Sequence, residues 1–175
     1  MAAVTAMFET MHSELDSITQ RLCGTLQPAP ILVNCISMVE DMALTYEPQL
    51  GSRILVEHPP ELFVTTYLED LLAAMREVIQ NAVDASKAVK GETPPVQIRL
   101  QRDPAGRDLT ISVCDRGPGL SGKAKIGLFA PGTVGWDHSE PRHKGMGLYV
   151  ARRMMNSIGA TFPLRLVPVV VPWFI

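Results

Sequence analysis

The sequence of 175 residues has no long apolar run, few aromatic side chains and no marked excess of either charge. Since a membrane-spanning helix needs about 18 or more consecutive apolar residues, we expect no transmembrane segment. The N-terminal stretch lacks a basic start and an unbroken apolar core, so we also expect no signal peptide. A net charge of −2 argues against nucleic acid or an anionic membrane surface as a partner. The hydrophobic content of 46% and charged content of 19% then indicate a soluble, cytoplasmic globular protein of about one domain.

Cysteine is also scarce, and its spacing does not indicate a metal site. The three cysteines, Cys23, Cys35 and Cys114, are an odd number without metal-ligand spacing. We therefore expect buried, reduced thiols of the kind found in cytosolic proteins.

Residues 1–50 are predicted to form a helical hairpin. A first apolar stripe at helical spacing comprises Val4, Met7, Met11, Leu15, Ile18 and Leu22. A second helix is predicted from about Ile31 to Tyr46, after a break that contains Pro28 and Pro30. Such a hairpin either packs on a second copy as a dimerisation segment or covers one face of the domain formed by residues 51–175, and both alternatives are open.

The remaining residues alternate between strand and helix patterns. The expected elements are a strand at 53–57, a helix at 68–89, strands at 96–102 and 109–114, a loop at 121–144, a helix from 145 to about 158, and a strand from 159. The strands at 96–102 and 109–114 are predicted to pair as a hairpin. Their core-facing side chains are expected to be Val96, Ile98, Leu100, Leu109, Ile111 and Val113.

A carboxylate ends one of these strands, and two glycines follow it at alternate positions. The segment reads Asp115-Arg116-Gly117-Pro118-Gly119-Leu120. The glycines let the backbone turn sharply and let a flat ligand approach without a Cβ in the way. The Asp115 side chain only accepts hydrogen bonds, which suits an exocyclic amino group such as that of adenine. Taken alone, however, the segment is more typical of an ordinary Gly/Pro turn.

Two further patterns carry polar groups at places that suit phosphate chemistry. Glu77 and Asn81 are four residues apart on the predicted helix at 68–89, so they share a face, with Ala85 one turn on. An amide oxygen there suits magnesium, and a carboxylate suits the polarisation of an acceptor. At the start of the next helix, Gly145-x-Gly147 would expose backbone N–H groups to an anion, with Lys144 adding a positive charge.

Taken in order, these motifs resemble the Bergerat-type, or GHKL, ATP-binding fold. The resemblance extends from about Arg53 to Thr161 and includes Gly159-Ala160-Thr161 after the last helix. It implies an α+β fold, a two-layer α/β sandwich, here preceded by the N-terminal hairpin. It also implies ATP and Mg²⁺ as ligands.

The resemblance implies roles for single residues. Asn81 would ligate Mg²⁺, Asp115 would accept from the adenine amino group, and Glu77 would be the catalytic carboxylate beside the γ-phosphate. Lys144 would neutralise the phosphates. Residues 121–144 would form a mobile lid. Further expected contacts to the nucleotide are Ala85, Gly117, Gly119, Phe129 as the anchor of that lid, His143, Gly145, Met146, Gly147, Leu148 and Thr161.

Within that superfamily, the stretches at 127–132 and 143–149 look most like those of sensor histidine kinases. This similarity implies the ATP-binding catalytic domain of a two-component kinase that phosphorylates a protein histidine, forms a homodimer and acts on a response regulator or another protein. His12 is a candidate phosphoacceptor, although Ser13 stands where the family places an acidic residue. The alternatives are a serine kinase similar to the anti-sigma factors and a nucleotide sensor that performs no chemistry.

The C-terminal stretch departs from the family pattern. Residues 162–175 contain three prolines within an apolar run, which argues against a central strand throughout. An altered C-terminus and a tail that docks on a partner are both compatible with this composition.

Overall fold

The computed structural model describes residues 29–103, 108–119, 127–130 and 145–159. The chain divides into two compact units after Pro30, and every described helix and strand lies in the second unit. This division differs from the expected one after residue 50. For the second expected helix, the structure agrees with the alternative in which the hairpin covers one face of the main domain, because residues 35–50 bury their apolar side in the core of the second unit. The first expected helix and the C-terminal tail lie outside the described residues.

The prediction of a helix from Ile31 is wrong at its start. Residues Ile31–Asn34 form strand β1, which pairs antiparallel with β3, Phe63–Thr66, and helix α2 covers Cys35–Leu50. The apolar run of β1 suits a strand as well as a helix, and Asn34 then fixes the helix boundary. Its side-chain oxygen accepts hydrogen bonds from the N–H groups of Ile36 and Ser37 at 3.1 and 3.3 Å, as expected of a good N-cap residue.

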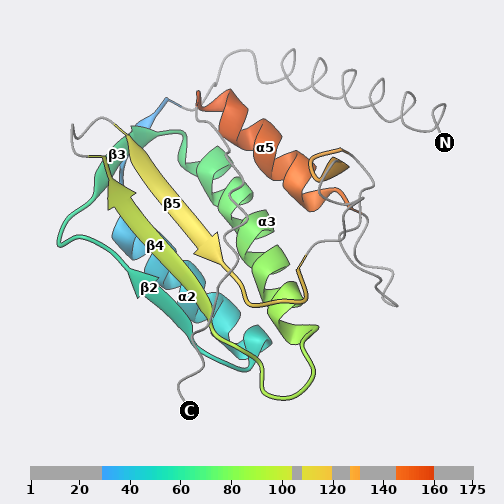
Figure 1. Ribbon diagram of the computed structural model, residues 1–175. Helices are drawn as coiled ribbons and strands as arrows, with labels where there is room; N and C mark the ends of the chain where they lie inside the picture. The colour runs from blue at the N-terminus through green and yellow to red at the C-terminus, as the bar shows by residue number, and fades with distance from the viewer. Residues whose placement is uncertain (1–28, 104–107, 120–126, 131–144, 160–175) are drawn as a thin grey trace, which may run out of the picture. The chain divides into compact units, whose positions relative to one another are not determined.

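A three-stranded sheet forms the layer opposite the helices (Figure 1). Its strands are β2 (Ile54–Glu57), β4 (Val96–Arg102) and β5 (Leu109–Cys114), in the order β2-β4-β5. β2 runs parallel to β4, and β4 pairs antiparallel with β5, which confirms the predicted hairpin. The predicted core side chains of β4 are fully buried, and those of β5 are half-buried against the same core.

Helix α3, Leu68–Lys87, is the central helix of the second layer. Figure 1 shows α3 between α2 and α5 (Gly147–Ser157), and α2 and α3 both contact the strands. Ile79 and Val83 of α3 are fully buried in the core. The predicted α+β, two-layer arrangement is therefore confirmed for the described residues.

The described residues show how long and apolar the helices are and whether the cysteines are paired. No helix in the described ranges is long and apolar enough to cross a membrane. Cys35 and Cys114 are both free thiols, the first buried and the second half-buried. Burial raises the pKa of the Cys35 thiol, which keeps it protonated, while the charge of Arg102 opposes this rise. Cys23 lies outside the described residues.

Candidate functional site

One face of α3 carries the polar residues that the sequence predicted to act together. Glu77, Asn81 and Ala85 follow at intervals of four residues, so they form a row along the helix. Glu77 and Asn81 are half-buried, whereas Ala85 is fully buried. From Glu77 to Ala85 the helix rises about 12 Å, at 1.5 Å per residue. A row of this length can contact both ends of a ligand the size of a nucleotide.

The first turn of α5 lies directly on two of these side chains. A Cβ atom added to Gly147 would stand 2.6 Å from Glu77 Oε2 and 3.3 Å from Asn81 Nδ2. Glycine allows this approach without displacing the Glu77 carboxylate, which any residue with a side chain would do. The Gly-x-Gly pattern at the start of α5 therefore serves to bring a helix N-terminus against a carboxylate and an amide.

Neither the Glu77 side chain nor the Asn81 side chain forms a hydrogen bond or an ion pair with another residue in the ranges that the structure describes. Half-buried polar groups usually have partners, because desolvating them without one costs free energy. Two such groups one turn apart on a helix are best explained by a ligand that supplies the missing contacts.

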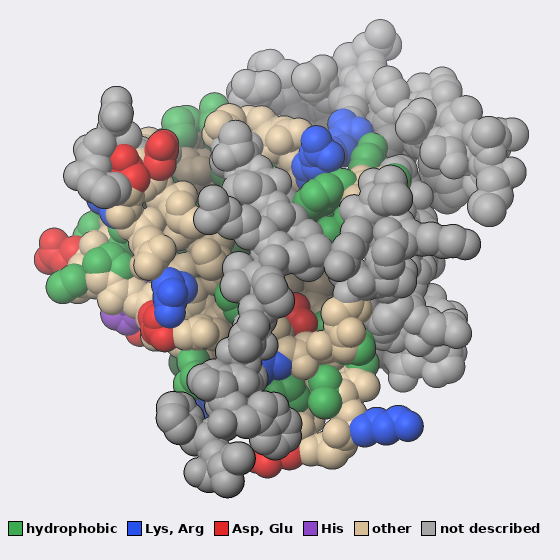
Figure 2. Space-filling model, in the orientation of Figure 1, with side chains coloured by type: hydrophobic (Ala, Val, Ile, Leu, Met, Phe, Trp, Pro, Cys, Tyr) green, Lys and Arg blue, Asp and Glu red, His purple; other side chains and the backbone are tan. Residues whose placement is uncertain are grey.

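The start of α5 provides a complementary place for negative charge. Met146 precedes the helix and forms no side-chain capping bond, and Gly145 has a positive φ of 65°. Uncapped N–H groups and the positive end of the helix dipole together favour an anion at this end. Figure 2 shows Lys and Arg side chains gathered over α5, where the helix carries Arg152 and Arg153.

The turn after β5 lies against the other end of the α3 row. Asp115 Oδ1 accepts a hydrogen bond from the Gly117 N–H at 2.9 Å, so this carboxylate holds its own turn. A Cβ on Gly117 would stand 2.6 Å from the Ala85 Cβ and 2.8 Å from the Ala85 carbonyl oxygen. Gly117 and Ala85 are thus both small because the turn and the helix touch. Asp115 itself is exposed, and among described residues its Oδ2 has no hydrogen-bond donor.

The contact between Arg152 and Phe129 was not expected from the sequence. The Arg152 guanidinium carbon lies 5.2 Å from the centre of the Phe129 ring, a cation–π geometry. Leu128, next to Phe129, is buried at 9% exposure. The segment 127–130 is therefore held against the body of the protein by an apolar side chain and by a cation from α5. The sequence offered no signal for this pair, because an exposed arginine on a helix is common.

The structure joins some of the predicted site residues in two contacts along α3. Glu77 and Asn81 meet Gly147, and Ala85 meets Gly117. Gly119, Gly145, Met146 and Leu148 are neighbours of these residues in the chain, and Phe129 contacts α5. The remaining predicted residues, His12, His143, Lys144 and Thr161, lie outside the described residues.

Histidine kinases are among the solved structures that are similar to this one. The catalytic domain of histidine kinase ThkA superposes with a TM-score of 0.60 at 16% identity, covering 75% of this chain and 82% of that one. The mycobacterial sensor histidine kinase MprB gives a TM-score of 0.57 at 19% identity, covering 74% of this chain and 80% of that one. At these identities the similarity establishes the fold.

A curated relative and a family profile extend the comparison to sequence. The C4-dicarboxylate transport sensor protein DctS of Rhodobacter capsulatus is 28% identical over 133 residues, which are 76% of this chain. The chain spans 19% of the length of that relative. The profile described as histidine kinase-, DNA gyrase B- and HSP90-like ATPase matches residues 67–168, which contain α3, the Asp115 turn and α5. The chain therefore belongs to the family of histidine kinase-, DNA gyrase B- and HSP90-like ATPases, a family that binds ATP.

Proposed function

We propose that this chain is the ATP-binding catalytic domain of a two-component sensor histidine kinase, which transfers the γ-phosphate of ATP to a protein histidine. The observation that carries the proposal is the pair Glu77 and Asn81. These side chains have no partner among described residues, and they meet the N-terminus of α5 at Gly147. A carboxylate, an amide and a helix N-terminus together suit the end of a nucleotide where phosphate is transferred.

The nucleotide would lie along the row on α3. Its adenine would reach the turn after β5, where Asp115 accepts from the exocyclic amino group and Gly117 and Gly119 shape the pocket. Its phosphates would reach the first turn of α5, with Lys144 and His143 as additional cationic partners. The rise of about 12 Å between Glu77 and Ala85 supports this orientation, because it separates the two ends of the site.

Magnesium fits this arrangement through Asn81. No group of three or more His, Cys, Asp or Glu side chains in the described residues could hold a metal ion by itself. Mg²⁺ usually takes few ligands from the protein and the rest from substrate phosphates and water, so a single amide oxygen suffices. When bound, the ion neutralises charge on the phosphates. Glu77, one helical turn away, would polarise the acceptor nitrogen and take up its proton.

The partners of the reaction are part of the proposal. We propose a cytoplasmic location, where ATP is available, a homodimer, and a response regulator or another protein as the recipient of the signal. His12 is the candidate phosphoacceptor within this chain. A histidine on another protein is the alternative source of the acceptor.

The test is phosphoryl transfer from γ-labelled ATP with magnesium, using the protein alone and with candidate partner proteins. The product is divided and treated with acid or with alkali. Phosphohistidine loses its label in acid and keeps it in alkali, whereas phosphoserine is stable to acid. We expect acid-labile label, and His12→Ala reports whether His12 carries it.

The other outcomes separate the alternatives. Acid-stable label on a partner would replace the proposal with a serine kinase similar to the anti-sigma factors. If no protein carries label although ATP is bound, the remaining alternative is a nucleotide sensor that performs no chemistry.

Adenine recognition is tested by Asp115→Asn. The asparagine oxygen can still accept from the Gly117 N–H, so the turn should persist. The charged acceptor is lost, and a hydrogen bond to a charged group contributes roughly 1.5–3 kcal/mol. ATP affinity measured by calorimetry should therefore fall by about tenfold or more. The neighbouring variant Arg116→Ala is the control for general changes in this turn, and equal affinities of Asp115→Asn and the unmodified protein would exclude Asp115 from the adenine contact.

A further inference from the structure

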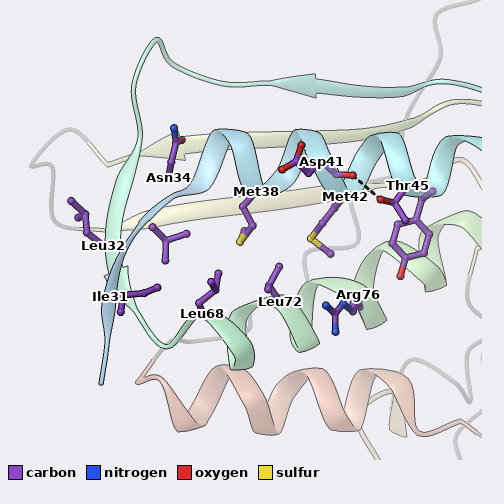
Figure 3. Close-up of a pocket in the computed structure, with 12 residues that line it drawn as sticks. Ile31, Leu32, Asn34, Met38, Asp41, Met42, Thr45, Leu68, Leu72 and Arg76 are labelled. Atoms are coloured by element: carbon purple, nitrogen blue, oxygen red, sulfur yellow. Dashed lines mark hydrogen bonds between the residues drawn. The ribbon is translucent and has the colours of Figure 1, made fainter. Parts of the chain in front are cut away.

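A cavity opens on the side of α3 that faces α2, and its lining contains none of the residues proposed to bind the nucleotide. It has a volume of about 540 Å³ and is lined by β1, α2 and the first half of α3. Figure 3 shows Met38 and Met42 of α2 pointing toward Leu68 and Leu72 of α3. Ligand pockets are typically of about 300–1,000 Å³ and mainly apolar, with a few polar groups. The cavity meets both criteria.

The apolar walls extend into an exposed rim. Ile31 and Leu32 of β1 line the cavity and remain 49% and 68% exposed. Two methionines, Met38 and Met42, belong to the lining, and their unbranched side chains adapt to ligands of different shape. These features suit a flexible apolar chain that enters at β1 and lies between the two helices.

Arg76 supplies a positive charge farther along α3 (Figure 3). Its side chain is exposed, and it forms no ion pair or hydrogen bond with another residue of the described part of the chain. Tyr46 lies beside it in the cavity wall. Burial raises the pKa of the Tyr46 phenol, the charge of Arg76 opposes this rise, and the carboxylates of Glu77 and Asp84 add to it, so the hydroxyl stays protonated and can donate.

The acidic residue of the lining does not offset this charge. Asp41 belongs to α2, and Figure 3 shows it on the side of that helix away from α3. Thr45, one turn on, donates its hydroxyl to the Asp41 backbone carbonyl at 2.9 Å. The end of the cavity between α2 and α3 therefore presents a cation and a phenol to a ligand.

This cavity and the nucleotide site use different rows of α3. Leu68, Leu72 and Arg76 follow at intervals of four residues and line the cavity. Glu77 and Asn81 belong to the next row, which meets α5. A ligand in the cavity would therefore leave the nucleotide contacts in place.

We propose that the cavity between α2 and α3 binds an amphipathic carboxylate, with its apolar chain between Met38, Met42, Leu68 and Leu72 and its carboxylate paired with Arg76. A planar guanidinium can bind a carboxylate through two parallel hydrogen bonds, which is the geometry in which such pairs are strong. This proposal goes beyond the proposed kinase function and does not depend on it.

The test uses octanoate as the probe and 1-octanol as its neutral analogue, both at low millimolar concentration. Methionine methyl groups are labelled with ¹³C, and NMR follows the resonances of Met38 and Met42. Met75, which is buried in the core and does not line the cavity, is the internal control. We expect octanoate to shift the Met38 and Met42 resonances and to bind about tenfold or more tightly than 1-octanol, because only octanoate pairs with Arg76.

Two variants separate the charge from the apolar contacts. Arg76→Gln should remove the preference for octanoate over 1-octanol, whereas Lys87→Gln, an equally exposed cation on the same helix, should keep it. Equal binding of the two probes to the unmodified protein would overturn the proposal. So would a preference that survives Arg76→Gln, or octanoate shifts absent from Met38 and Met42. ATP affinity, measured separately, reports on the nucleotide site and should be the same in both variants.

Discussion

Replacing Glu77 by glutamine should lower the rate of phosphoryl transfer by about 10²–10⁴-fold, the usual contribution of a general base. Glutamine keeps the size of the side chain, so its contact with Gly147 and the start of α5 should persist. ATP affinity should therefore remain near that of the unmodified protein. Single-turnover transfer from γ-labelled ATP, together with calorimetric titration of ATP, separates these two effects.

Glu69→Gln is the matched control, because Glu69 is an exposed carboxylate in the first turn of the same helix and contacts no part of the site. Its transfer rate should be unchanged. If Glu77→Gln transfers phosphate at the unmodified rate, Glu77 is not the catalytic carboxylate. A loss of ATP affinity without loss of rate at saturating ATP would instead assign Glu77 to binding.

The long or strongly periodic elements could be predicted from the sequence. The helix expected at 68–89 is α3, Leu68–Lys87, and the strands expected at 96–102 and 109–114 are β4 and β5. In these segments the local pattern and the tertiary environment agree, because one face of each is buried in the same core. Their hydrophobic pattern is therefore sufficient to predict the type and the approximate bounds of these elements.

The short elements at the start of the domain could not be predicted in the same way. β1, Ile31–Asn34, has only four residues and leads directly into a helix, so its apolar side chains extend the helical pattern of α2. Its partner β3, Phe63–Thr66, is equally short and lies far away in the sequence. Pairing between such strands depends on the fold as a whole. The pattern of α2 likewise leaves open whether this helix covers the domain or packs on a second copy, and its place against the core is settled by tertiary contacts.

For the site, the residue types were predictable, but their contacts were not. The spacing of Glu77 and Asn81 indicated a shared helix face, and the glycines at 117 and 147 indicated close approaches of the backbone. Which atoms those glycines approach depends on how α3 packs against α5 and against the turn after β5. The pair of Arg152 and Phe129 likewise arises from packing alone.

The contact between α5 and Glu77 leads to a second large effect, which is expected for Gly147→Ala. The added Cβ would stand 2.6 Å from Glu77 Oε2, the far end of a flexible side chain. The Glu77 carboxylate should move aside, away from the acceptor nitrogen that it polarises. A displacement of about 1 Å can lower a rate by roughly 10²-fold. The helix itself should not suffer, because alanine is favoured over glycine within helices by roughly 0.5–1 kcal/mol. We therefore expect a transfer rate about 10²-fold lower in a protein whose thermal unfolding temperature does not fall.

A double mutant tests whether this loss acts through Glu77. If Gly147→Ala only displaces the Glu77 carboxylate, adding it to Glu77→Gln should reduce the rate little further, since the group it displaces is already gone. Asn156→Ala is the control, because it places alanine at an exposed position of α5 away from Glu77, and it should leave the rate unchanged. Losses that add fully in the double mutant would show that Gly147 acts separately from Glu77. In that case the first turn of α5 would contribute through the phosphates, and ATP affinity would fall in Gly147→Ala alone.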